Sequence, residues 1–184
     1  DRHGLLLIFD EVITGFGRLG AMFAAERFGV VPDMILFAKT VSNGAAPLGG
    51  VIVRRALHDA IMQGPAHLAE LMHGYTCSGH PLSCAAGLAM LDVLHEEELV
   101  SRAAQLAQPF EDAVHQLAGL PGVVSVRNLG LAAGIELAVI DGQPGRHGAQ
   151  VQAAAFDRGL LTRAPGDTLV LAPPFVCTPD NIRD

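Results

Sequence analysis

Two short apolar runs, each followed at once by a charged residue, constrain the fold of this chain most strongly. Residues 5–9 run directly into Asp10, and residues 34–38 run directly into Lys39. Unbroken apolar runs of this length are typical of β-strands that are covered on both faces. If the two strands are parallel neighbours joined by a short crossover, both charged side chains lie at the carboxyl edge of one sheet, where open α/β folds bind ligands. An acid and an amine at such an edge form either an ion pair or a reactive site, and the pattern leaves both open.

The pattern that follows predicts an α/β first part with parallel strands, which ends near residues 95–100. We expect further elements there: a strand at 50–53, helices at 21–28 and 56–62, and a helix that opens at Pro81 with His80 as its cap. The second part is expected to be α+β. A helical pattern over 99–117 contains Pro109, which implies a kink or a break. Its other expected elements are strands at 123–126, 131–139, 160–163 and 168–172 and a helix at 149–158.

Composition and charge exclude several classes of function. Half of the 184 residues are hydrophobic and 17% are charged, which is enough for a packed core. The net charge of −7 and the lack of a basic stripe argue against nucleic acid and anionic membranes as partners. No apolar run approaches the roughly 18 residues that would cross a bilayer. The three cysteines form no CxxC pair and the eight histidines have no metal-ligand spacing, so we expect no disulfide framework, no metal site and a cytoplasmic location.

The two ends of the sequence read as cut ends. The first residue is not Met, and an apolar strand begins within a few residues with no signal peptide before it. Thr178 and Pro179 are typical of a helix start, but the chain stops at Asp184. We therefore expect a fragment of a longer protein.

A glycine motif in the first part tempts a dinucleotide-binding interpretation. Residues 15–20 match G-x-G-x-x-G, and Asp33 follows at a suitable distance. In the true motif the glycines follow the strand directly and open a helix, because the pyrophosphate binds at the helix N-terminus. Here residues 10–14 separate the strand from Gly15, and Asp33 precedes the second strand instead of ending it. We therefore reject NAD binding.

Lys39 is the only lysine in a chain that has eleven arginines. A single lysine can have a special role, but codon bias alone could also leave one. Four segments of the sequence resemble the class III pyridoxal-phosphate (PLP) aminotransferases. They are residues 7–18, 32–39, 43–51 and 73–81. The last is similar to a loop of the ω-amino-acid:pyruvate branch, which includes β-alanine:pyruvate aminotransferases. The resemblance covers essentially the whole chain. It implies the PLP-dependent transferase fold type I, with residues 1–97 as the C-terminal part of the large PLP-binding domain and residues 98–184 as a truncated α+β small domain.

The resemblance also implies roles for residues around the cofactor. Lys39 would form the Schiff base with the cofactor aldehyde and then act as proton shuttle. Arginine could not replace it, because a guanidinium stays protonated and an attacking amine must be neutral. Asp10 would pair with the pyridine nitrogen and keep the ring an electron sink. Val12 would pack against the ring face, or it is an ordinary core residue, and the two readings are compatible.

Three further residues are assigned by resemblance. Thr76 would donate its hydroxyl to the cofactor phosphate of the partner subunit, and the alternative is a local bond to the backbone. Tyr75 would border the substrate channel, and the alternative is a core residue. Arg163 would form a bidentate contact with the substrate carboxylate and swing aside for donors that lack one, and the alternative is a surface arginine.

The expected reaction is amino transfer from an ω-amino acid or amine to pyruvate. The resemblance implies small-molecule amine and keto-acid substrates and a homodimer or dimer of dimers, because the site is shared across the interface. The alternatives are a 4-aminobutyrate- or ornithine-type class III aminotransferase, an aminomutase, or a non-catalytic truncated α/β fragment. The sequence departs from the family at Leu19, where Thr is common, and at Cys77, where Tyr is expected. The family's phosphate-binding turn, its ring-stacking aromatic and an upstream acid lie before Asp10, so this piece alone need not be active.

Overall fold

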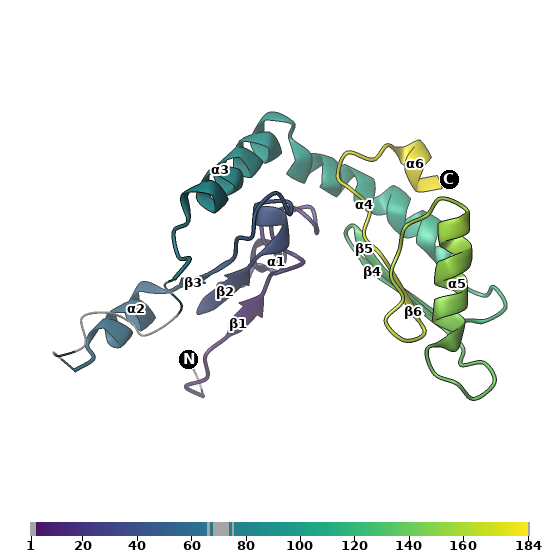
Figure 1. Cartoon of the computed structure of the whole chain (residues 1–184), viewed down its shortest axis with the longest axis horizontal. Helices are drawn as coiled ribbons and strands as arrows, with labels where there is room; N and C mark the ends of the chain where they lie inside the picture. The colour runs from purple at the N-terminus through teal and green to yellow at the C-terminus, as the bar shows by residue number, and fades with distance from the viewer. Residues whose placement is uncertain (1–2, 66, 68–73, 75, 184) are drawn as a thin grey trace. The chain divides into compact units, whose positions relative to one another are not determined.

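The computed structural model describes residues 3–65, 67, 74 and 76–183, and the chain divides into two compact units (Figure 1). The first unit comprises Asp1–Gly17 with Ala21–Glu98, and the second comprises Arg18–Gly20 with Leu99–Asp184. The assignment of residues 1–97 and 98–184 to a large and a small domain stays a prediction. None of the helices in the described ranges is both long enough and apolar enough to cross a membrane.

The sheet of the first unit has three strands in the order β1-β2-β3. These are β1 (Ile8–Asp10), β2 (Met34–Phe37) and β3 (Gly50–Val53). The predicted parallel pairing is confirmed for β1 and β2, but β3 runs antiparallel to β2, so the expectation of parallel strands throughout is wrong. The physical reason is the connection at residues 38–49, which is a 3₁₀ turn and a glycine-rich loop without the crossover helix that a parallel strand requires.

The expected cover on both faces of the strands is not found among the described residues. Leu5 is 77% exposed, Ile8 is 51% exposed, and Val51 and Ile52 of β3 are about half exposed. The first strand is also shorter than the expected 5–9 and ends at Asp10 itself. An apolar run shows that a strand is suited to burial, but it does not show which segment supplies the cover.

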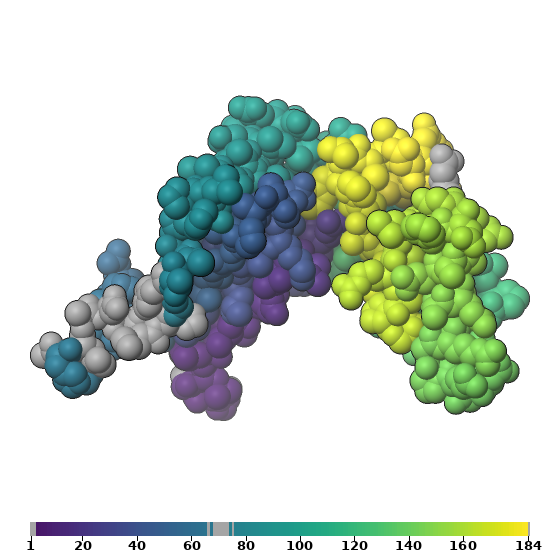
Figure 2. Space-filling view, in the orientation of Figure 1, coloured from purple at the N-terminus to yellow at the C-terminus, as the bar shows by residue number. Residues whose placement is uncertain are grey.

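The first unit contains four helices among its described residues. These are α1 (Ala24–Arg27), the 3₁₀ helix η1 (Lys39–Val41), α2 (Arg55–Met62) and α3 (Pro81–Glu96). The predicted helices are confirmed, although α1 covers only four residues of the expected 21–28. His80 stands at the N-cap of α3 but makes no side-chain capping hydrogen bond. Figure 2 shows α3 in teal at the surface of this unit, where Leu82 and Leu88 are exposed.

Helix α3 contacts η1, the turn that begins with Lys39. The approach is close at Gly87, where an added Cβ would stand 2.7 Å from Cδ2 of Leu48. Glycine at this position therefore lets the helix pack tightly beside the loop that follows η1. The packing supports the backbone around Lys39 from one side.

The second unit contains an antiparallel sheet in the order β4-β5-β6 with helices packed on it (Figure 1). Its elements are α4 (Leu99–His115), β4 (Val123–Leu129), β5 (Ala132–Leu137), α5 (Arg146–Asp157), β6 (Thr168–Leu171) and α6 (Pro179–Arg183). The predicted strand at 160–163 is wrong. Only Arg163 pairs there, in an isolated bridge to Val170, because the segment leaves the sheet after one residue.

Pro109 lies inside α4 and does not end it, so of the predicted kink or break the break is wrong, and the kink stays a prediction. A proline removes one backbone hydrogen bond from a helix interior. The surrounding face offsets this loss, because Leu99, Ala103, Leu106, Phe110 and Val114 recur at helical spacing and are buried.

Arg18 ties the short segment 18–20 into the second unit. Its guanidinium donates to the carbonyl oxygens of Leu131 (3.2 Å) and Pro173 (2.6 Å) and stacks over the ring of Phe175 at 4.6 Å. Burial lowers the pKa of Arg18 from its ordinary value. The next residue, Leu19, is fully buried, so the departure from the family's usual Thr is accommodated by apolar packing.

The start of α5 is held by a carboxylate from a distant loop. Asp167 accepts hydrogen bonds from the amides of Gly145 (2.6 Å) and Gly148 (2.9 Å), and the second of these lies in the first turn of the helix. These two bonds, with Gly145 the larger cause, hold the pKa of Asp167 below its ordinary value. A Cβ at Gly148 would collide with the carbonyl oxygen of Gly166, so the helix start and this loop are closely joined.

We expect Asp167→Asn to lower the thermal midpoint at about pH 7, and we expect this effect to shrink as the pH falls below about 4. The folded-state pKa is depressed, so the ionised carboxylate stabilises the fold above the ordinary pKa of about 3.9 and loses this effect as the pH falls through the folded value. Circular dichroism melts of the parent protein and the variant, from about pH 7 to about pH 3, measure the difference between their thermal midpoints. Asp141→Asn is the control, because Asp141 makes only an exposed ion pair with Arg146. A difference in thermal midpoint that does not depend on pH would contradict the stabilising role of the ionised Asp167 carboxylate.

Candidate functional site

The carboxyl ends of β1 and β2 place Asp10 and Lys39 at one edge of the first sheet. Asp10 pairs in register with Leu36, and the amide of Glu11 donates to the carbonyl oxygen of Leu36 (2.9 Å). Lys39 follows the end of β2 after one intervening residue, Ala38. Because the two strands are parallel neighbours, both charged residues lie just beyond the same edge. This is the place where open α/β sheets bind ligands.

Lys39 has an unusual backbone and an available side chain. Its φ angle is 53°, in the left-handed region that a residue with a side chain adopts only at some cost. The side chain is exposed, and among the described residues its amine makes no ion pair or hydrogen bond. The ion-pair alternative of the sequence is therefore not formed here. Strained residues cluster at functional sites, and Lys39 combines this conformation with a place at the carboxyl edge of the sheet.

Asp10 is exposed and its carboxylate shapes the turn that follows the strand. One oxygen accepts a hydrogen bond from the amide of Val12 (3.1 Å), which is the local bond that aspartate favours in turns. Val12 is half-buried, and so it stays compatible with both of its expected roles. The structure thus brings Asp10, Val12 and Lys39 to one edge of one sheet.

Glu11 is a buried carboxylate that the sequence reasoning did not single out. It is 1% exposed, and it accepts hydrogen bonds from the hydroxyl of Thr14 (2.7 Å) and the amides of Ala24 (2.7 Å) and Ala25 (2.8 Å). The two amides begin α1, whose positive end favours an anion. Glu11 therefore fixes the loop that leaves the site. The sequence held one signal for this residue: Glu11 is an acidic residue that lies between a strand and two apolar residues, Val12 and Ile13.

The glycine motif has a structural explanation. Helix α1 begins only at Ala24, so the glycines at 15–20 do not open it. Asp33 lies at the amino end of β2, where its carboxylate accepts from the amide of Leu7 (2.8 Å) and pairs with Arg54 (3.2 Å). This acid joins the three strands at the edge opposite Asp10. In a dinucleotide-binding fold the acid that binds the ribose lies at the carboxyl end of the second strand, which is the other edge.

The remaining predicted site residues lie elsewhere. Thr76 is in an exposed turn, where its amide donates to the carbonyl oxygen of Gly74 (2.8 Å), and its hydroxyl makes no bond to the described residues. Tyr75 lies outside the described residues. Arg163 belongs to the second unit.

Arg163 has a fixed backbone and a free side chain. Its carbonyl oxygen accepts from the amide of Val170 (2.8 Å), in the bridge to β6. The guanidinium is exposed and makes no hydrogen bond or ion pair with any described residue. An arginine held in this way is suited to bind a planar acid from solution.

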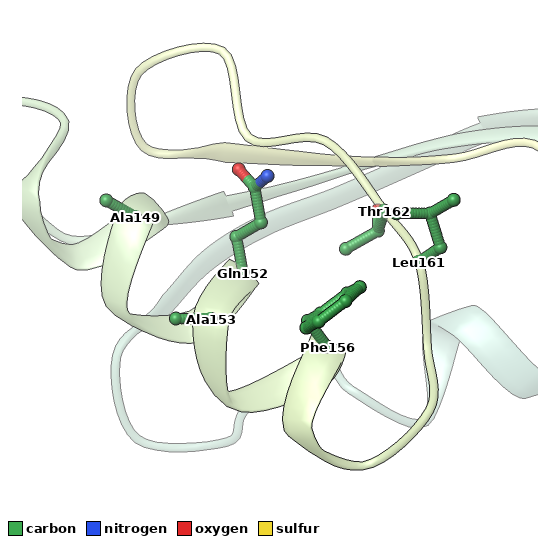
Figure 3. A pocket seen from close by; sticks show the side chains of 6 residues that line it. All are labelled: Ala149, Gln152, Ala153, Phe156, Leu161 and Thr162. Carbon is green, nitrogen blue, oxygen red and sulfur yellow. The ribbon is translucent and has the colours of Figure 1, made fainter.

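Two open cavities lie within the units. A cavity of about 280 Å³ is lined by Val53, Arg55 and His58 in the first unit. A cavity of about 360 Å³ lies in the second unit between α5 and residues 161–162 (Figure 3). None of the described residues that line these cavities is a predicted site residue. Within the described ranges, no three histidine, cysteine, aspartate or glutamate side chains gather as a metal ion would require.

The two charged side chains at this edge of the sheet fit a cofactor that carries an aldehyde on a pyridine ring. An amine suited to a carbonyl group and a carboxylate suited to a ring nitrogen follow adjacent strands. The profile of the family "Aminotransferase class-III" matches residues 1–184. The chain belongs to the class III aminotransferases.

The relatives and solved structures agree with this family. The chain is 53% identical to an omega-aminotransferase of Caulobacter vibrioides, over 99% of this chain and 42% of that protein. It is 46% identical to a beta-alanine–pyruvate aminotransferase of Pseudomonas aeruginosa, over 99% of this chain and 41% of that protein. The omega transaminase of Pseudomonas jessenii in complex with PMP shares the fold with a TM-score of 0.91 at 32% identity, over 98% of this chain and 41% of that one. The chain therefore has an α/β fold of the transaminase type, and it spans about two fifths of the length of these relatives.

We expect Glu11→Gln to destabilise the protein by about 1–3 kcal/mol, measured by urea unfolding. Glutamine keeps one acceptor oxygen, but its NH2 group cannot accept a hydrogen bond, so at least one of the three donors now bonded to Glu11 loses its partner. Glu26→Gln is the matched control, because Glu26 accepts a single exposed bond from the amide of Met22. An equal loss of unfolding free energy in the two variants would contradict the structural role of Glu11.

Proposed function

We propose that the protein containing this chain is a PLP-dependent transaminase that moves an amino group from an ω-amino acid or amine to pyruvate. The observation that carries the proposal is the placement of Lys39, in a left-handed turn just beyond β2 and beside the end of β1 at Asp10. Membership of the class III aminotransferases and the names of the most similar relatives support it. The names favour the pyruvate branch over a 4-aminobutyrate- or ornithine-type aminotransferase, an aminomutase or a non-catalytic fragment.

Lys39 and Asp10 would divide the work at the cofactor. When bound, PLP withdraws electrons from the substrate carbon that carries the amine. The Nζ atom of Lys39 would hold the cofactor through its aldehyde carbon. Once released, it would take the proton from the substrate carbon that carries the amine and deliver it to that former aldehyde carbon. The free oxygen of the Asp10 carboxylate would accept a hydrogen bond from the protonated ring nitrogen. The bond from the amide of Val12 keeps that carboxylate oriented.

The other members of the site complete the proposal. Val12 would contact the face of the ring, and Thr76 would donate its hydroxyl to the phosphate held by the partner subunit of a homodimer or dimer of dimers. The exposed Thr76 hydroxyl, which the described residues leave without a bond, supports this role. Tyr75 would border the substrate channel. Residues 1–97 would belong to the large PLP-binding domain and residues 98–184 to the small one, in a cytoplasmic enzyme.

Arg163 would select substrates that carry a carboxylate. Its guanidinium presents two parallel N–H donors that match the two oxygens of an acid. Because no described residue holds the side chain, it is also free to move aside for amines without an acid group. An ω-amino acid and the keto acid pyruvate both supply the group that this arginine binds.

We expect Lys39→Ala to abolish the visible absorption band of the lysine-bound cofactor and to lower kcat by a factor of about 100 to 10,000, the usual range for a lost proton-transfer group. Absorption spectra of the full-length enzyme with added PLP and a pyruvate-dependent transamination assay measure the two effects. Arg163→Ala is the control, because it leaves Lys39 in place and keeps the band. A band of normal intensity in Lys39→Ala would refute the proposal.

We expect Arg163→Ala to raise KM for β-alanine about tenfold to a hundredfold, as for a lost hydrogen bond between charged groups. KM for a primary amine without a carboxylate changes little, because that substrate does not use the arginine. Arg158→Ala is the matched control. Among the described residues, the Arg158 side chain donates only to the carbonyl oxygen of Ala154, on the helix that Arg158 follows. An equal rise for both donors would show that Arg163 does not read the carboxylate.

A further inference from the structure

We propose that Gln152 is a positioning residue for Arg163, and that it tunes the preference of the enzyme for donors with a carboxylate. This inference rests on the role proposed for Arg163. Gln152 lies on α5, and its Oε1 atom accepts a hydrogen bond from the amide of Ala164 (3.1 Å). Figure 3 shows its side chain reaching from the helix toward the segment that contains Thr162.

Three successive residues of this segment are each held by one hydrogen bond. The hydroxyl of Thr162 donates to the carbonyl oxygen of Val170 (2.8 Å), and the amide of Val170 donates to the carbonyl oxygen of Arg163 (2.8 Å). These two bonds tie the segment to β6 on one side. The bond from Ala164 to Gln152 ties it to α5 on the other side, so Arg163 lies between two anchors.

Packing does not supply the anchor on the helix side. The cavity of about 360 Å³ lies between α5 and residues 161–162, and it is lined by Gln152 together with small or apolar side chains (Figure 3). Phe156 is 66% exposed and Leu161 is 83% exposed, so neither fills the gap. A segment above an open cavity can move toward the helix unless a polar bond holds it. Gln152 makes that bond.

The path of the anchored segment sets which way Arg163 faces. Neighbouring side chains of an extended segment point in opposite directions. Thr162 is buried and Arg163 is exposed, as this alternation requires. A shift of the segment would turn the guanidinium away from the position in which both of its N–H groups meet one carboxylate, and errors of about 1 Å matter at such contacts.

Gln152→Met in the full-length enzyme is the decisive variant, because methionine keeps the length of the side chain but removes the strong acceptor. We expect KM for β-alanine to rise about fivefold, as for one lost neutral hydrogen bond, with kcat and the KM for a carboxylate-free amine unchanged. Hydrogen exchange is the second readout. The amide of Ala164 should exchange faster in the variant, whereas the amide of Val170 keeps its protection. The matched control is Gln150→Met, at an exposed neighbouring position on α5.

The double variant Gln152→Met with Arg163→Ala separates the possible failures. If Gln152 acts through Arg163, the double variant has the same KM for β-alanine as Arg163→Ala alone. Additive effects, or a similar rise in KM for both kinds of donor, would overturn the role of Gln152 and leave Arg163 in place. If Arg163→Ala shows no selectivity for carboxylate donors, the role proposed for Arg163 fails and the inference on Gln152 fails with it.

Discussion

The parallel pairing of β1 with β2 determines where Asp10 and Lys39 lie. Each strand is only three or four residues long, and the register sets Asp10 opposite Leu36. A slip of one residue would turn every side chain of a strand to the other face of the sheet. Asp33 and Arg54 secure the amino ends of the strands, and Glu11 secures the loop beyond the carboxyl end of β1. Polar groups at both ends of the short strands thus support one register.

Much of the fold follows from the sequence, because apolar periodicity and punctuation reflect local physics. Pro81 marks the start of α3, and residues 50–53 form β3 as the pattern predicts. The direction of β3 was not predictable from its apolar character, since it depends on how residues 38–49 turn. Pro109 gives a similar lesson. A local rule predicts an interruption, but the buried face of α4 overrides it.

The placement of the candidate site at one edge of the sheet was predictable, whereas the roles of its residues stay a proposal. Lys39 stands out as a lone amine after a strand, and Asp10 stands out as an acid after its neighbour. Their shared edge follows from the topology. The bonding partners of Glu11 and Gln152 were not predictable, because they lie more than ten residues away in the sequence. Those partners become visible only when the chain is folded.

The positive φ angle of Lys39 has a consequence for the evolution of such a chain. A side chain in the left-handed region costs on the order of 1–3 kcal/mol, and glycine would relieve that cost. Selection for thermal robustness alone would therefore favour the loss of the amine at this position. The role proposed for Lys39 would make this position a compromise in which reactivity outweighs robustness.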